Sequence, residues 1–159
     1  MIGCTKQIAL KVFLLGLFAG TLDIIAAFID AYVSYGSFPG KVLNGITTAA
    51  VGYSPGLPYS INALLGLGIH LFIAQGFTML FYCCYPFIKK MLRNDWLIGI
   101  LYGIFIWAFM RFVILPAFSH IKFTDFEIRK AIKPAMILVI AIGLPLSFLT
   151  KRFYLQKTL

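Results

Sequence analysis

Charged residues are scarce in this sequence, and their scarcity excludes most classes of soluble protein. Only 12% of the 159 residues are charged, whereas 61% are hydrophobic. A soluble domain carries about 25% charged residues, because its surface must be hydrated. A soluble globular enzyme and a disordered chain are therefore excluded. The composition predicts a protein whose solvent is lipid.

Cysteine is also rare, with three residues at Cys4, Cys83 and Cys84. Their number and spacing fit neither a disulfide framework nor a metal-binding motif. We interpret the adjacent Cys83 and Cys84 as buried packing thiols, with acylation near a helix end as the alternative. The sequence contains no zinc signature, nucleophile elbow or phosphate-binding loop. An enzymatic activity is therefore the less favoured hypothesis, and no cofactor is expected.

Acidic residues are the scarcest charged group, with 5 Asp and Glu against 14 Lys and Arg and a net charge of +9. Nucleic-acid binding would require these cations to form a continuous basic stripe or a patch interleaved with aromatic residues. They lie at the ends of apolar runs instead, which is typical of charges that set topology and face lipid headgroups. Membrane lipids are the expected partner, and nucleic acid is not.

Four apolar stretches are long enough to cross a membrane, which takes about 20 residues. They cover about residues 12–33, 61–85, 96–115 and 134–150. The connection between the first two encloses an apolar run, 41–52, that is too short to cross and too apolar for water. We therefore predict an all-α polytopic membrane protein. It consists of one transmembrane domain, residues 1–159, with a four-helix bundle and a short interfacial or re-entrant helix.

Local signals predict two further features of these helices. Asn94 and Asp95 precede the third stretch and can cap its helix. Pro145 follows Gly143 in the fourth stretch. We expect it to kink that helix, because proline lacks the amide hydrogen and crowds the preceding turn.

The positions of Lys and Arg predict the orientation in the membrane. With the N-terminus inside, eight basic residues are cytoplasmic: Lys6, Lys11, Lys89, Lys90, Arg93, Lys151, Arg152 and Lys157. The outer side then holds five, which are Lys41, Lys122, Arg129, Lys130 and Lys133. Because basic loops favour the cytoplasm, both termini are predicted to be cytoplasmic.

Four polar side chains within the apolar stretches need a partner or water, since charge is costly at membrane depth. They are Asp23 and Asp30 in the first stretch, His70 in the second and Arg111 in the third. The two acids share a helix face, about 10 Å apart. Counting from the outer ends places Asp23 and His70 at similar depths, roughly 15 and 14 Å. Arg111 is expected to reach toward either acid, and we call these four residues the polar cluster.

Two hypotheses for the polar cluster remain open. In the functional one, Asp23 or His70 changes protonation while Arg111 holds a carboxylate ionised, which makes the cluster responsive to protons or ions. In the structural one, a buried Asp–Arg pair only fixes helix register, and His70 is a hydrogen-bonded packing residue.

Glycines line the same helix face as the two acids. Gly16 and Gly20 form a GxxxG pattern in the first stretch, and Gly99 and Gly103 form another in the third. Small residues at this spacing let membrane helices pack closely, so we expect all four to be helix-packing residues. An internal two-plus-two duplication is the weaker interpretation.

Several short motifs together resemble one family. They are Gly16-Leu-Phe-Ala-Gly20-Thr-Leu-Asp23-Ile, Leu65-Gly-Leu-Gly-Ile-His70-Leu-Phe-Ile-Ala74, Leu101-Tyr-Gly103, Val113-Ile-Leu-Pro116 and Gly143-Leu-Pro145. In this order they resemble a family of small, uncharacterised four-span bacterial inner-membrane proteins. The resemblance implies four spans and a bacterial inner membrane, with Asp23, His70, Arg111 and Pro116 at motif positions. It implies no established activity.

The sequence therefore predicts an integral inner-membrane protein that permits or senses protons or small solutes through the polar cluster. Because four helices enclose little space, conduction would require a homo-oligomer. The alternative is a non-catalytic accessory or scaffold subunit of a larger membrane complex. A membrane-embedded enzyme ranks third.

Overall fold

The computed structural model describes residues 2–52, 56–118 and 128–155, which are mostly helical. The first half of the chain contains the long helices α1 (Ile2–Tyr35) and α3 (Tyr59–Met91), with the short helix α2 (Pro39–Val51) between them. The next long helix continues from α4 (Asp95–Phe109) through the π-helical segment η1 (Met110–Ile114) into α5 (Leu115–Phe118). The last comprises α6 (Ile128–Leu138), the π-helical segment η2 (Val139–Gly143) and α7 (Leu144–Leu155).

Four helices are long and apolar enough to cross a membrane. They are Gln7–Tyr35, Tyr59–Met91, Asp95–Ala117 and Ala131–Tyr154, and each contains the corresponding apolar stretch of the sequence. Large hydrophobic side chains such as Phe13, Phe72 and Met79 are more than half exposed, which is typical of a surface that meets lipid. The prediction of an all-helical chain with four membrane-length helices is confirmed for the described residues. The chain is compatible with an integral, multi-pass membrane protein.

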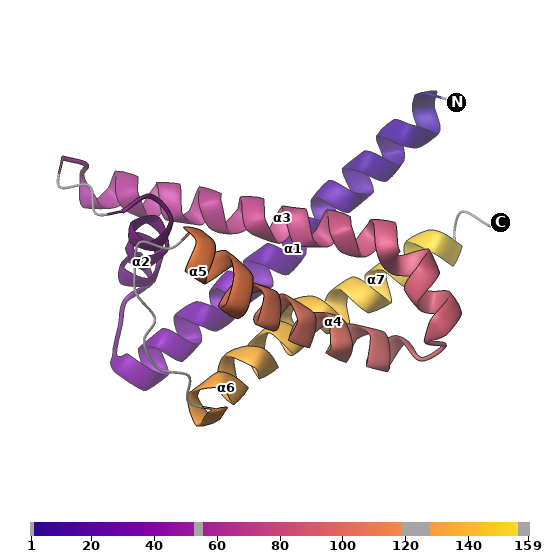
Figure 1. The fold of residues 1–159 in the computed structure, drawn as a ribbon. Coiled ribbons are helices and arrows are strands. Elements are labelled where there is room, and N and C mark those ends of the chain that lie inside the picture. Colours follow the sequence, from indigo (N-terminus) through magenta and orange to yellow (C-terminus); the bar gives the residue numbers. More distant parts are fainter. Residues whose placement is uncertain (1, 53–55, 119–127, 156–159) are drawn as a thin grey trace.

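The long helices associate in two pairs (Figure 1). One pair is α1 with α3, and the other is α4 with the helix made of α6, η2 and α7. A shared hydrophobic core joins the pairs, with buried members Leu15, Ala19, Phe77, Phe81, Tyr85, Ile98, Tyr102, Ile106, Ile142 and Leu146. The start of α1, the end of α7 and the α3–α4 turn lie at one end of the bundle, and α2 and α5 lie at the other (Figure 1).

The short helix α2 packs against the first turns of α3. It begins at Pro39, where a missing amide hydrogen has no cost, and it is followed by Gly52, whose φ of 90° favours glycine. Its Thr47 hydroxyl donates to the Asn62 carbonyl oxygen at 2.6 Å. Gly66 of α3 lies so close to the α2 backbone that a Cβ would collide with it. Whether α2 lies at the membrane interface or re-enters the membrane stays a prediction.

Each of the last two spans contains a π-helical segment that ends two residues before a proline. The segment η1 ends at Ile114, ahead of Pro116, and η2 ends at Gly143, ahead of Pro145. A proline ring crowds the carbonyl four residues earlier, and in both spans that carbonyl lies within the π-helical segment. The sequence predicted a kink at Pro145, and the structure has a wider π-helical turn there, which relieves the same crowding.

The adjacent cysteines of α3 face outward. Cys83 and Cys84 are free thiols with exposed side chains, so their interpretation as buried packing residues is wrong. The neighbouring side chains that do enter the core are Phe81 and Tyr85, four residues apart on the opposite face. A helix that is apolar on every face does not reveal from sequence which face packs against protein, and this explains the error.

Candidate functional site

Asp23 of α1 and His70 of α3 lie side by side between the two helices. Asp23 Oδ2 is 3.8 Å from His70 Nε2, and each side chain is 15% exposed. Both residues lie more than ten residues from the ends of their membrane-length helices. Carboxylate and imidazole groups exchange protons in the acidic to neutral range. This pair can therefore change charge within a mostly apolar environment.

The Gly20 carbonyl oxygen determines where His70 carries its hydrogen. His70 Nε2 lies 3.0 Å from this oxygen. Because a carbonyl oxygen only accepts hydrogen bonds, Nε2 must be the protonated nitrogen of the neutral ring, and Nδ1 must be the free one. A proton gained on acidification therefore adds at Nδ1. Asp23 then interacts with the ring through its charge, without taking the hydrogen that Gly20 accepts.

A second polar contact joins the same two helices further along. Gln75 Nε2 of α3 donates to the Val12 carbonyl oxygen of α1 at 3.3 Å. A Cβ at Gly16 would collide with the Gln75 amide, and a Cβ at Gly20 would lie 2.9 Å from the Ala74 Cβ. The two glycines thus leave the space in which polar groups of α3 reach carbonyl oxygens of α1.

The other two members of the polar cluster lie in separate surroundings. Asp30 forms an ion pair with Lys133 of α6. The same ammonium group donates to Ser34 Oγ at 2.6 Å, and Ser34 donates to Asp30 at 3.2 Å. Arg111 lies in η1 and has contacts of its own. The structure thus brings Asp23 and His70 together, gives Asp30 a lysine partner, and places Arg111 outside these two pairs.

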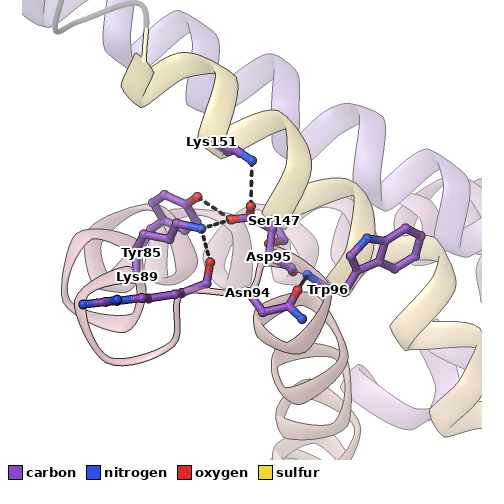
Figure 2. Close-up of polar contacts among 8 residues, drawn as sticks. Tyr85, Lys89, Asn94, Asp95, Trp96, Ser147 and Lys151 are labelled. Carbon is purple, nitrogen blue, oxygen red and sulfur yellow. Dashed lines mark hydrogen bonds and ion pairs between the residues drawn. The ribbon is translucent and has the colours of Figure 1, made fainter.

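A polar network at the opposite end of the bundle was not predicted from the sequence. The Asp95 carboxylate accepts hydrogen bonds from Lys89, from Lys151 at 2.8 Å and from Tyr85 at 3.3 Å (Figure 2). The Asp95 backbone carbonyl accepts a further bond from the Ser147 hydroxyl at 2.8 Å. Asp95 is only 8% exposed. We call these five residues the Asp95 network, and it ties together the ends of α3, α4 and α7.

The cap of α4 explains why Asp95 is free to form this network. Asn94 Oδ1 accepts a hydrogen bond from the Trp96 amide at 3.0 Å and caps the helix (Figure 2). Asp95 therefore does not need to cap, and its carboxylate turns to the two lysines. One signal in the sequence could have revealed this role. Asp95 is the only acidic residue on the side predicted to be cytoplasmic, where eight residues are basic.

The two sites differ in the chemistry open to them. Both Asp95 oxygens are engaged by ammonium groups, so this carboxylate is a fixed charge that joins helix ends. Asp23 faces a single ring whose charge can change. Within residues 2–52, 56–118 and 128–155 there is no group of three or more His, Cys, Asp and Glu side chains that could hold a metal ion. Comparisons of the chain with protein-family models, curated proteins and solved structures find no match.

Proposed function

We propose that this membrane protein binds a proton at the Asp23–His70 pair and uses the resulting change of charge to sense or to pass protons. The observation that carries the proposal is the position of the pair. An acid and an imidazole lie 3.8 Å apart on two membrane-length helices. Charge in a poorly solvated interior is unfavourable unless it is balanced, so protonation there has structural consequences.

The pair has two forms without net charge. In one form both groups are neutral, and in the other a carboxylate faces an imidazolium ion and attracts it. Gain or loss of one further proton leaves an unbalanced charge between α1 and α3. Because His70 is held on the Gly20 carbonyl, its ring cannot turn away without breaking that bond. A change of protonation therefore acts on the contact between the two helices.

An effect of protonation on the contact between α1 and α3 supports a sensing function most directly. Conduction needs in addition a hydrated path, and four helices enclose little space, so the conducting form of the proposal includes a homo-oligomer. The same pair serves both forms, and the same variants test them.

Asp23→Asn should remove the proton-binding carboxylate from the pair. Infrared difference spectra of the protein in lipid vesicles, recorded between neutral and acidic pH, should show the carbonyl band of a protonated carboxylic acid in the wild type. Asp23→Asn should lack this band. His70→Gln should keep the band but move its pH midpoint, since the neighbouring ring charge is gone. Asp30→Asn is the matched control because it removes an acid from the same helix face and should retain the band.

Proton flux into vesicles loaded with a pH-sensitive dye separates the two forms of the proposal. If the wild type conducts, Asp23→Asn and His70→Gln should reduce the flux to that of protein-free vesicles, and Asp30→Asn should not. If both variants at the pair keep the wild-type infrared band and its midpoint, the pair is a structural contact. That result would contradict the proposal and favour an accessory subunit of a larger membrane complex.

We further propose that the membrane is a bacterial inner membrane and that both termini face the cytoplasm. The start of α1, the end of α7 and the α3–α4 turn lie at one end of the bundle (Figure 1). The last turns of α3 and α7 and the turn after α3 contain the basic residues Lys89, Lys90, Arg93, Lys151 and Arg152. This concentration of basic residues supports the orientation. A topology reporter fused after Leu159 should give a cytoplasmic signal. An external signal from that fusion would contradict the orientation.

A further inference from the structure

A shallow depression lies on α7 at the basic end of the bundle. Its volume is about 480 Å³, and its lining residues are Phe148, Leu149, Lys151 and Arg152. Two of these side chains are apolar and two are cationic. The depression therefore combines an apolar floor with positive charge at the end of a membrane-length helix.

The two cations of the depression differ in their contacts. Lys151 is held by Asp95 through the 2.8 Å hydrogen bond of the Asp95 network. Arg152 is exposed, and its side chain forms no hydrogen bond or ion pair within the described part of the chain. Its guanidinium group thus has all its donors available for a ligand.

The surroundings of the depression are positive as well. Lys11 of α1 lies over the Phe153 ring, 5.6 Å from its centroid, one residue beyond the depression. Asp95, the acid that binds Lys151, has its two carboxylate oxygens engaged by Lys89 and Lys151. Two ammonium groups face this one carboxylate, so its negative charge does not repel an approaching anion.

We infer that this depression binds the phosphate group of an anionic membrane phospholipid. Arg152 provides a planar set of donors that matches phosphate oxygens, and Lys151 adds charge beside it. Phe148 and Leu149 contact the apolar part of the lipid next to the phosphate. A soluble phosphate ion would leave this apolar floor uncovered, and this favours a lipid. The inference rests on the proposal that the chain spans a membrane, but it does not depend on proton binding by Asp23 and His70.

Arg152→Gln should weaken this binding without affecting folding, because the side chain is exposed and forms no hydrogen bond or ion pair with any residue that the structure describes. The full chain in a non-ionic detergent is titrated with phosphatidylglycerol, and bound lipid is counted by native mass spectrometry. We expect the dissociation constant to rise about tenfold, equivalent to about 1.4 kcal/mol. Arg152→Lys should show a smaller loss, since it keeps the charge but lacks the fork of donors.

Arg93→Gln is the matched control because Arg93 is exposed at the same end and does not line the depression. It should change the dissociation constant less than about twofold. Equal weakening by both Gln variants would overturn the inference in favour of diffuse attraction. Equal binding of phosphatidylcholine would overturn the role of net negative charge. Displacement of the lipid by an equal concentration of glycerol phosphate would assign the site to soluble anions and overturn the lipid assignment.

Discussion

Asp95→Asn is expected to lower the free energy of unfolding by about 2–3 kcal/mol. Removing one partner of a buried ion pair costs about 3–5 kcal/mol because the remaining charge is left uncompensated. Lys89 and Lys151 are partly exposed, with side chains 32% and 44% accessible. Water therefore screens part of their repulsion, and the effect is smaller than in a fully buried pair.

The network geometry explains why asparagine cannot replace this aspartate. The amide keeps one oxygen acceptor, but its nitrogen would face an ammonium group that also donates. Tyr85 would compete with the lysines for the single oxygen, which leaves at least one polar group at the junction without its partner. The ends of α3, α4 and α7 would lose the contact that joins them.

Unfolding by sodium dodecyl sulfate in mixed micelles measures this effect. Asp30→Asn is the control, since it also removes an acid from an ion pair. The lysine of that pair, Lys133, is more exposed than Lys89 and Lys151. The Asp30→Asn change should cost less than about 1 kcal/mol. In a double-mutant cycle, Lys151→Met should be less costly in the Asp95→Asn background than in the wild type, because it removes an uncompensated charge. An Asp95→Asn protein as stable as Asp30→Asn would show that the network contributes nothing beyond a surface ion pair.

The placement of Asp23 beside His70 shows what the sequence could predict. In a membrane helix, residue number translates into depth at about 1.5 Å per residue, and the predicted depths of these two residues were nearly equal. The Gly16 and Gly20 positions identified the face of α1 that lies against α3. Length of apolar runs, depth and small-residue spacing are all local properties. They were sufficient for the helices and for the similar depth of the two residues, but not for the contact between them, which depends on how α1 and α3 face each other.

The partners of Asp30 and Asp95 could not be predicted in the same way. The contact of Lys133 with Ser34 spans 99 residues, and that of Lys151 with Asp95 spans 56. Both depend on how the last helix packs against the others, which depth alone does not determine. Depth likewise does not determine the direction in which Arg111 points from its helix. A single acid among many bases, on the side predicted to be cytoplasmic, was the one local clue to the Asp95 network.

Gly103→Ala should destabilise the contact between α4 and the last helix by about 2 kcal/mol. A Cβ at Gly103 would lie 2.5 Å from the Val139 Cα and 2.8 Å from the Val139 nitrogen. These are backbone atoms, so the two helices would have to move apart. Overpacking of this kind costs about 1–3 kcal/mol, and the better helix propensity of alanine offsets at most about 1 kcal/mol of it.

Gly76→Ala is the matched control, because Gly76 lies in the middle of α3 and a Cβ there would meet nothing within 4 Å. Its stability in the same micelle assay should equal or slightly exceed that of the wild type, since alanine favours the helix without a collision. The difference in the free energy of unfolding between the two variants measures the cost of the collision separately from the gain in helix propensity. Gly143 faces Gly99 and Gly103 across the same contact, so the backbones there approach without intervening side chains, as is typical of small-residue contacts in membranes. Equal stabilities of Gly103→Ala and Gly76→Ala would mean that α4 and the last helix can move apart without a cost in free energy, and close approach would then not determine how these two helices pack.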